Sequence, residues 1–306
     1  MKPRRSKLQP PRWIAEPQWL REPLDNAPLP DFSQGLRLLT LNVAHGRKLA
    51  THQALLNQET VRRNLQEIAE VIGMQDADVV ALQEADGPSA WSGNFDHVER
   101  LAELTSLGHH FRGEHNPFAL GRANLASGTA LLGRLPLVGP HSHRFGSSWR
   151  DTKGFVVATV PVAAWGGLEI DVVSLHLEPF LPTLRRQQIV RLTDVMRYRS
   201  RPLVVMGDFN CSWCEDARQL QPLAAELGLR AFHPYRKAPT YPARRPWRRL
   251  DWILVSPELE FAGYHTLPNP VSDHLAVVAD VRLGVAAGKL QQSAAEAATA
   301  ALPGTA

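Results

Sequence analysis

The sequence lacks the features that mark membrane-spanning and disulfide-stabilised proteins. It holds two cysteines in 306 residues, too few for a disulfide framework, so a reducing compartment, the cytoplasm, is expected. No run of 18 apolar residues occurs, and no transmembrane segment is expected. The first residues carry positive charge, but no apolar stretch follows them, which argues against a secretory signal.

Acidic residues are scarce in two regions. Residues 1–22 contain six basic and two acidic side chains, so this stretch accounts for the whole formal net charge of +4. We predict that residues 1–35 form an extended, basic, proline-rich arm that can touch a membrane surface peripherally. Residues 230–249 hold six arginines and one lysine with no Asp or Glu. The alanine-rich residues 285–306 are expected to form a flexible tail, which leaves residues 36–284 as one folded domain.

The remaining composition is that of a globular protein, with 44% hydrophobic and 21% charged residues. Apolar residues recur at helical spacing from Val61 to Ile72 and again within residues 184–198, which predicts two helices. Strands are expected at residues 36–43, 78–83, 128–132, 155–161, 169–177, 203–207, 250–255 and 274–281. Many strands with few helices indicate a four-layer α/β sandwich, in which two sheets pack face to face with helices outside.

Polar residues occur where these strands begin or end. They are Asn42, Glu84, His176, Asp208, Asn210, Asp251, Asp273 and His274. Strand ends meet at the edges of a sheet, so the sequence predicts that these side chains share one cleft. Burying so many ionisable groups costs several kcal/mol for each unpaired charge, so a cation or a substrate is expected to compensate. A set rich in carboxylate and amide oxygens favours Mg²⁺ or Mn²⁺ over zinc.

Six short motifs carry these residues in a fixed order. They are Leu41-Asn42-Val43, Leu82-Gln83-Glu84, Ser174-Leu175-His176-Leu177, Gly207-Asp208-Phe209-Asn210, Arg249-Leu250-Asp251-Trp252-Ile253 and Ser272-Asp273-His274. Together with the segment 128–136, this order resembles the endonuclease/exonuclease/phosphatase family over residues 36–283. The resemblance implies a deoxyribonuclease-I-like sandwich of two mostly antiparallel sheets flanked by helices. It also implies a metal-dependent hydrolase of phosphoesters.

The resemblance implies three metal-associated residues. Glu84, supported by Asn42, matches the metal-binding carboxylate of the family, and the metal, Mg²⁺ or Mn²⁺, would polarise a phosphoryl oxygen. Asp273 matches a second carboxylate that is associated with the metal.

The resemblance also implies five catalytic residues. Asp208 matches the residue that positions or deprotonates the attacking water, and Asn210 matches the amide that holds the phosphate. His274 matches the histidine that faces the scissile phosphate, and Asp251 matches the carboxylate that orients this histidine. His176 matches the second histidine of the deoxyribonuclease and sphingomyelinase branches. Positioning and charge neutralisation are what in-line phosphoryl transfer needs.

A departure from the family at Ala44 and the basic segment 230–249 both bear on the substrate. Ala44 stands where abasic-site endonucleases usually carry an acidic residue, and Ala44-His45-Gly46 resembles a bacterial subgroup related to proteins acting on lipid or glycolipid phosphates. The basic segment precedes the Asp251 strand, and we expect it to hold substrate through Arg244, Arg245, Arg248 and Arg249.

The predicted function is therefore a monomeric phosphodiesterase that acts on a lipid headgroup or small phosphoester. A second histidine, His176, is available to assist an alkoxide leaving group. Two alternatives stay open at this point. One is an endonuclease or exonuclease that cleaves DNA or RNA, and the other is a catalytically inactive phosphate-binding protein.

Overall fold

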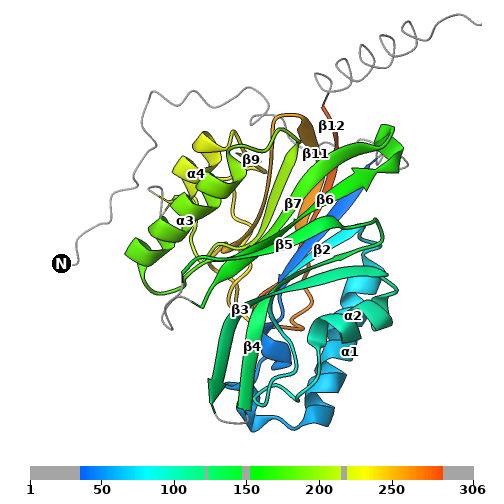
Figure 1. Ribbon diagram of the computed structural model, residues 1–306, viewed down its shortest axis with the longest axis vertical. Coiled ribbons are helices and arrows are strands. Elements are labelled where there is room, and N and C mark those ends of the chain that lie inside the picture. The colour runs from blue at the N-terminus through cyan, green and yellow to red at the C-terminus, as the bar shows by residue number, and fades with distance from the viewer. Residues whose placement is uncertain (1–34, 121–122, 147–151, 215–218, 285–306) are drawn as a thin grey trace, which may run out of the picture. The chain divides into compact units, whose positions relative to one another are not determined.

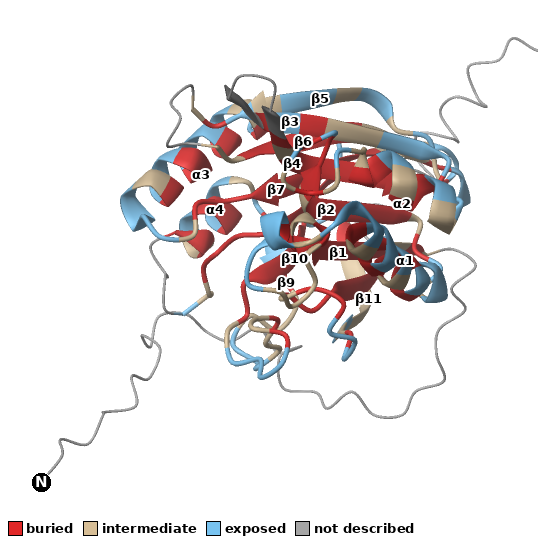
Figure 2. Cartoon of the chain, turned by 90° about the horizontal axis from the view of Figure 1, so that it is seen from below, coloured by how far each residue is buried: buried red, intermediate tan, exposed pale blue. Residues whose placement is uncertain are grey.

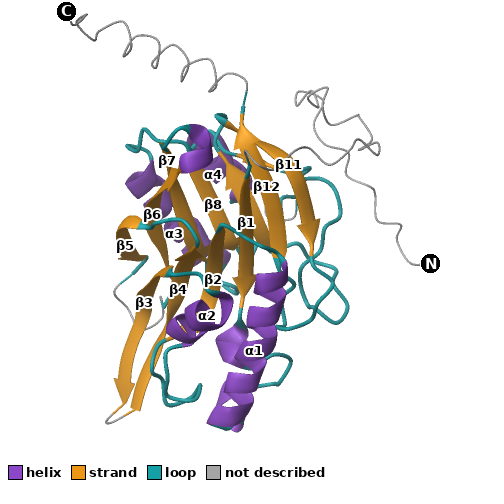
Figure 3. Cartoon of the chain, turned by 90° about the vertical axis from the view of Figure 1, so that its right-hand side faces the viewer, coloured by secondary structure: helices purple, strands orange, loops and turns teal. Residues whose placement is uncertain are grey.

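A computed structural model describes residues 35–120, 123–146, 152–214 and 219–284 of the chain. These residues form two six-stranded sheets and four α-helices, arranged in layers (Figures 1 and 3). The predicted four-layer α/β sandwich is thereby confirmed. The arm expected at residues 1–35 (except Gly35) and the tail expected at residues 285–306 lie outside the described residues. Within the described part of the chain, no helix has the length and hydropathy needed to cross a membrane.

The first sheet has the strand order β11-β12-β1-β2-β4-β3. Its members, in chain order, are β1 Leu36–Asn42, β2 Val79–Asp86, β3 His109–Leu120, β4 Ala123–Gly133, β11 Leu259–Thr266 and β12 Val277–Leu283. β1 and β2 run parallel, and the other neighbouring pairs run antiparallel. The parallel pair brings the carboxyl ends of β1 and β2 to the same edge of the sheet.

The second sheet repeats this plan with the order β5-β6-β7-β8-β10-β9. Its members are β5 Val138–Arg144, β6 Gly154–Val162, β7 Leu168–His176, β8 Leu203–Asp208, β9 Arg230–Ala231 and β10 Asp251–Val255. β7 and β8 are its parallel pair, and the other pairs run antiparallel. Each sheet therefore has one edge at which two parallel strands end together.

Two helices cover each outer face. They are α1 Gln58–Met74, α2 His97–Thr105, α3 Pro182–Met196 and α4 Leu220–Glu226. The α1 helix begins after Asn57, whose side chain accepts a hydrogen bond from the Thr60 backbone N–H at 2.8 Å. Asp96 caps α2 in the same way through the N–H groups of Val98 and Glu99. Such caps satisfy backbone donors that the first helical turn leaves unpaired.

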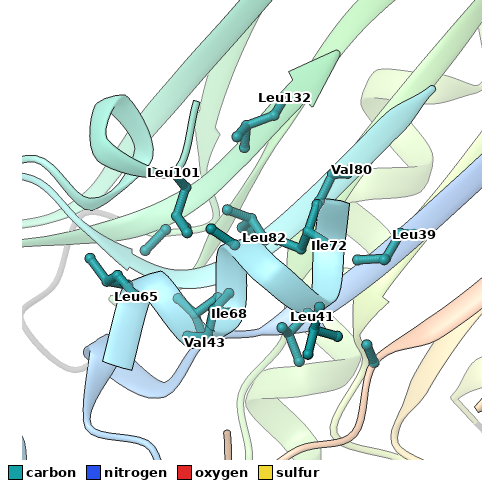
Figure 4. Close-up of a cluster of buried hydrophobic side chains, with 14 of the residues drawn as sticks. Leu39, Leu41, Val43, Leu65, Ile68, Ile72, Val80, Leu82, Leu101 and Leu132 are labelled. Carbon is teal, nitrogen blue, oxygen red and sulfur yellow. The ribbon is translucent and has the colours of Figure 1, made fainter. Parts of the chain in front are cut away.

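The hydrophobic residues form three separate cores because the side chains of each strand alternate between faces. On β1, Leu38 packs between the two sheets, whereas Leu39 and Leu41 pack against α1 and α2 (Figure 4). A third core lies between the second sheet and α3 with α4. The inner faces of the helices are buried accordingly, while their outer faces are exposed (Figure 2).

Every predicted strand and both predicted helices are present. One difference in a strand boundary affects the position of two predicted site residues. The strand expected at residues 274–281 begins at Val277. The N–H of Leu275 bonds instead to the carbonyl of Thr240 at 2.8 Å, which keeps residues 272–276 in a loop. That loop carries Asp273 and His274.

Candidate active site

The register of the second sheet aligns three of the predicted residues in one row. His176 of β7 lies opposite Asp208 of β8, and Asp208 lies opposite Asp251 of β10. Residues directly opposite one another point to the same face, and neighbouring strands lie only about 5 Å apart. The backbone pairing alone therefore brings an imidazole and two carboxylates together.

His274 joins this row from the other sheet, because it precedes β12. Its Nδ1 donates to Asp251 Oδ2 at 2.9 Å, and its Nε2 lies 3.7 Å from Asp208 Oδ2. Burial lowers the pKa of His274, but the charges of Asp251 and Asp208 outweigh burial and raise it to about 10. The ring of Tyr241 packs beside it, with a centroid distance of 4.7 Å. His274 is thus an imidazolium cation between two carboxylates.

Asp208 is almost fully buried and is held by two donors. Asn42 Nδ2 donates to its Oδ2 at 3.1 Å, and the Asn210 backbone N–H donates to its Oδ1 at 2.9 Å. Burial raises the pKa of Asp208 to about 7, although the cation of His274 opposes this shift. A carboxylate that exchanges its proton near neutral pH has the property required of a general base.

Glu84 lies at an irregular position of β2. The pairing of β2 with β4 shifts register between Gln83 and Ala85, and the φ of Glu84 is +52°. A positive φ is uncommon for a residue with a side chain and occurs at functional sites held by their surroundings. This bulge separates Glu84 from the buried Gln83, whose amide bonds to Ser174 of the second sheet at 3.2 Å.

Basic groups surround the Glu84 carboxylate. His45 Nε2 lies 3.3 Å from its Oε2, and Lys153 Nζ lies 3.6 Å from its Oε1. Burial by itself would raise the pKa of Glu84, but His45 and Lys153 outweigh burial and hold that pKa well below its usual range. Glu84 is therefore an anion at neutral pH.

His45, to which no role was assigned from the sequence, is held in place by Asp86. Its Nδ1 donates to Asp86 Oδ1 at 2.8 Å, and Trp91 Nε1 donates to the other oxygen of Asp86 at 2.9 Å. Burial lowers the pKa of His45, while Glu84 and Asp86 outweigh this effect and raise it. The sequence signal that could have pointed to His45 is the strand end Glu84-Ala85-Asp86. Its two carboxylates are on alternate residues, and both contact His45.

Lys153 is the second functional residue that the sequence analysis missed. A lysine only donates, so its Nζ must donate to His176 Nδ1 at 3.2 Å. Burial and the charge of Lys153 lower the pKa of His176 well below its usual value, so the ring is neutral and keeps its proton on Nε2. That atom lies 3.5 Å from Asp208 Oδ2. Lys153 directly precedes β6, and the antiparallel pairing of β6 with β7 sets Gly154 opposite His176. The start of β6 and the end of β7 therefore lie side by side, which brings Lys153 close to His176.

Most of these groups line one cavity of about 450 Å³, whereas His45 stands behind Glu84 and does not line it. The predicted residues on its wall are Asn42, Glu84, His176, Asp208, Asn210, Asp273, His274 and Arg248. Lys153 and Tyr241 line it as well, and Asp251 supports His274 from a fully buried position. Asn210 turns its amide N–H toward the Leu177 carbonyl at 2.9 Å, which fixes this side chain. The structure thus gathers the predicted strand-end residues around one space.

The predicted metal-associated residues have partners of their own in this arrangement. The carboxylate of Asp273 accepts a hydrogen bond from the guanidinium of Arg47. Asn42 Oδ1 accepts the N–H of Ala44 at 3.0 Å. Among the described residues, one group of three acidic or imidazole side chains is close enough together to hold a metal ion, namely Asp208, Asp251 and His274. In that group, the raised pKa of His274 keeps a proton on both ring nitrogens, so this imidazolium has no free lone pair for a metal.

The predicted substrate-binding arginines divide into three types. Arg248 is half-buried and lines the cavity. Arg244 and Arg245 are exposed and do not line it. Arg249 is buried, donates to the carbonyls of Phe232 and His233, and stacks on Trp252 at 3.8 Å from the ring centroid. The structure therefore gives Arg249 a role in holding the loop rather than a place at the cavity.

The chain was compared with known proteins. The family model described as the Endonuclease/Exonuclease/phosphatase family matches residues 39–274. A comparison with curated protein sequences gave no match. An endonuclease/exonuclease/phosphatase from Beutenbergia cavernae is 24% identical with a TM-score of 0.65, covering 82% of this chain and 72% of its own.

Two further solved structures resemble the chain at lower identity. The human Nocturnin catalytic domain with a bound sulfate anion is 21% identical with a TM-score of 0.59, covering 82% of this chain and 94% of its own. A mannosyl-6-phosphatase from Bacteroides thetaiotaomicron is 14% identical with a TM-score of 0.59, covering 80% of this chain and 99% of its own. At these identities the likeness concerns the fold.

Proposed function

The chain belongs to the endonuclease/exonuclease/phosphatase family and is a phosphoester hydrolase, and we propose that it acts as a divalent-metal-dependent phosphodiesterase on small substrates. Residues 36–284 are the catalytic domain in this proposal. The observation that carries it is the position of Asp208 between two imidazoles on the cavity wall. His176 Nε2 lies 3.5 Å and His274 Nε2 lies 3.7 Å from the same carboxylate oxygen.

The donor set on the Glu84 side fits a hard divalent cation. Glu84 is anionic and lines the cavity, and its basic neighbours lie beyond the 2.7 to 3.2 Å of a normal hydrogen bond. Its oxygens are thus loosely held, and carboxylate oxygen is what Mg²⁺ and Mn²⁺ prefer. Glu84 with Asn42 would hold the ion, and Asp273 would join on release from Arg47. The bound ion would polarise a phosphoryl oxygen.

The two imidazoles have opposite protonation states, which gives them different tasks. Asp208, with a pKa raised to about 7 by burial, accepts the proton of the attacking water. His274 is a cation with Asp251 behind it and donates to a phosphoryl oxygen that gains negative charge. His176 is neutral, with its Nε2–H directed to the same region; it donates this proton to the leaving oxygen while its Nδ1 takes a proton from Lys153 Nζ. A second histidine of this kind is most useful when the leaving group is an alkoxide, as in a diester.

The inactive phosphate-binding alternative has no support in the geometry. Each residue that the family resemblance assigned to catalysis lies on the cavity wall or directly behind it. The cavity of about 450 Å³ also matches the size of small-ligand sites, which favours a small phosphoester or the headgroup of a larger one.

A substrate panel tests the proposal. Bis(p-nitrophenyl) phosphate, p-nitrophenyl phosphate and a phospholipid are assayed with Mg²⁺, with Mn²⁺ and with EDTA. Metal-dependent turnover of a diester in preference to the monoester is expected. Equal rates in EDTA would contradict the role of the metal, and a preference for the monoester would identify a phosphatase.

A further inference from the structure

A second cavity of about 460 Å³ lies beside the catalytic one, and Arg248 lines both. We call this second cavity the outer groove. Its aromatic and cationic lining comes from Trp213, Tyr235, Arg236, Lys237, Trp247 and Trp252. Nothing in the proposed chemistry uses it.

One loop separates the two cavities. The backbones of Tyr241 and Arg248 pair as an isolated bridge, with the Arg248 N–H donating to the Tyr241 carbonyl at 3.0 Å. The Trp247 N–H donates to the same carbonyl at 3.0 Å. Tyr241 lines the catalytic cavity beside His274, whereas Trp247 lines the outer groove. The two cavities therefore lie on either side of this loop and share Arg248 as a lining residue.

The floor of the outer groove is rigid. The guanidinium of Arg249 stacks on the Trp252 ring and is fixed by two backbone carbonyls. The rings of Trp213 and Trp252 lie 5.8 Å apart. Trp252 is 1% exposed, so this packing anchors the loop that carries Trp247 rather than offering a ring for stacking, and an anchored loop loses little entropy when a ligand binds.

The rim of the outer groove is exposed, aromatic and cationic. Trp247 is 69% exposed and Tyr235 is 43% exposed. Arg236 and Lys237 are exposed as well, and residues 230–249 contain no acidic side chain. Large aromatic side chains are usually buried, so two exposed rings beside uncompensated cations indicate a binding surface for a planar, anionic ligand.

We propose that the outer groove binds the nucleoside of a phosphodiester whose scissile phosphate lies in the catalytic cavity. This inference rests on the proposed phosphodiesterase function and names its substrate class, a single-stranded or dinucleotide diester. The base stacks on Trp247 and Tyr235, while Arg236, Lys237 and Arg248 contact phosphate oxygens. The base must be unpaired, because a stacking surface engages the face of a base rather than its edge.

A pair of esters isolates the contribution of the groove. Thymidine 5′-(p-nitrophenyl) phosphate and methyl p-nitrophenyl phosphate share a leaving group and differ in the nucleoside. Stacking of one base contributes about 5- to 100-fold in affinity. Trp247→Ala should therefore lower the ratio of kcat/KM for the nucleoside ester to kcat/KM for the methyl ester by about that factor. Trp247→Phe should restore most of the ratio, because it keeps a stacking ring.

Two matched controls use the same chemistry elsewhere on the surface. Tyr198 is 86% exposed and follows α3, so Tyr198→Ala removes an exposed ring that lines neither cavity. Arg236→Gln removes a cation of the outer groove and should also lower the ratio. Arg63 is exposed on α1, so Arg63→Gln is the control that makes the same charge change outside the groove. Both controls should leave the ratio unchanged. A ratio that Trp247→Ala does not alter, or that Tyr198→Ala alters equally, would overturn the groove assignment while leaving the phosphodiesterase function intact.

A binding measurement separates this inference from the activity. Wild-type protein and Trp247→Ala are titrated calorimetrically with a thymidine tetranucleotide in EDTA, where turnover is absent. Binding that weakens about 5- to 100-fold in Trp247→Ala supports the groove even if no ester is hydrolysed. Sedimentation with phosphatidylcholine vesicles containing about 30% phosphatidylserine provides the opposing arm. Vesicle binding that depends on Trp247, together with no tetranucleotide binding, would show that the rim contacts a lipid surface instead.

Discussion

The two ends of the catalytic cavity have charges of opposite sign at their centres. At one end a carboxylate, Glu84, lies among bases, with His45 and Lys153 as its neighbours. At the other end a base, His274, lies between the carboxylates of Asp251 and Asp208. Each central group keeps its charge despite burial because its neighbours carry the opposite one.

The contacts differ in length as well as in sign. The His274–Asp251 hydrogen bond is 2.9 Å long, whereas the contacts of the Glu84 carboxylate with His45 and Lys153 are 3.3 and 3.6 Å long. A short bond fixes the orientation of a ring that must donate a proton. Longer contacts leave lone pairs available for another cation. The difference indicates that the His274 end is built for a fixed partner and the Glu84 end for an exchangeable one.

The largest expected effect is at the exchangeable end. Glu84→Gln keeps the shape of the side chain but removes the charge, so metal affinity and activity should both be lost, with kcat/KM falling by about 10³-fold or more. Calorimetric titration with Mn²⁺ gives a readout independent of turnover. The control is Glu169→Gln, an exposed glutamate paired with Arg201, which should behave as wild type. Retained activity and Mn²⁺ binding in Glu84→Gln would refute the exchangeable end.

At the fixed end, single substitutions should cost somewhat less. Asp208→Ala and His274→Ala are each expected to lower kcat by about 10²-fold or more, as for a lost general base or a lost donor to the transition state. Because the two groups act on one water and one phosphate, the double variant should lose much less than the product of the two single losses. Steady-state kinetics of the three variants provide the test, and simple multiplication of the losses would mean that the two act independently.

Much of this site could be predicted from the sequence, because its residues lie at strand ends that short motifs mark. The order of Asn42, Asp208 and His274 within their short motifs indicated the fold through the resemblance to the family, and the many apolar strands with few helices indicated its layers. The strands β3, β5, β9 and β11 were not predicted; all four are edge strands, and they are either short or carry many polar or exposed residues. The α2 helix is only nine residues long, too short for a clear helical period.

The residues that the sequence did not reveal act through tertiary contacts. Lys153 has an ordinary Lys-Gly context, and its importance comes from the Glu84 and His176 side chains that the two sheets bring to it. Arg249 was expected at the substrate because it belongs to an arginine-rich segment, whereas stacking on Trp252 turns it inward. Charge patterns show which residues are basic, but packing decides which of them reach the cavity.

A third histidine near the Glu84 end, His115, lies beside His45 and Lys153, and its Nε2 is 2.9 Å from the Thr129 hydroxyl. We expect it to affect stability rather than activity. Burial first, and then Lys153, lower the pKa of His115 to about 3, against about 6.5 in an unfolded chain. Between these values the unfolded state binds more protons, so stability is full above about pH 6.5 and falls as the pH drops toward 3. At pH 5 this amounts to about 2 kcal/mol, or roughly a 30-fold change in the unfolding equilibrium.

Urea unfolding of His115→Gln at pH 7 and pH 5 measures this effect. The variant should lose less stability than wild type on acidification, whereas His110→Gln, which removes an exposed ring from the same strand, should lose as much as wild type. Parallel losses in all three proteins would show that His115 is not the acid-sensitive group.

Lys153 allows a milder test of the Glu84 end. Lys153→Met removes one charged donor, and a hydrogen bond to a charged group contributes about 1.5 kcal/mol or more, so kcat/KM should fall about tenfold. The same substitution should raise the pKa of His176, which Lys153 lowers; NMR titration of that ring reports this directly. Lys153→Arg should restore most of the activity. An unchanged His176 titration would remove Lys153 from the site.

The smallest effect is expected from Arg244 and Arg245, whose replacement should not change the salt dependence of KM. Arg244 and Arg245 are exposed and line neither cavity, so a dinucleotide should not reach them. One contacted phosphate predicts that KM rises only about threefold between about 50 and about 300 mM salt. Replacing both arginines with glutamine should leave that slope unchanged, and steady-state kinetics on a dinucleotide measure it. On a long single strand, a slope that corresponds to three or more phosphates and that the double variant flattens would mean that the substrate extends beyond the two cavities. In that case the paired charges of the catalytic cavity would select the bond to be cleaved, and the exposed Arg244 and Arg245 would bind further phosphates of the polymer.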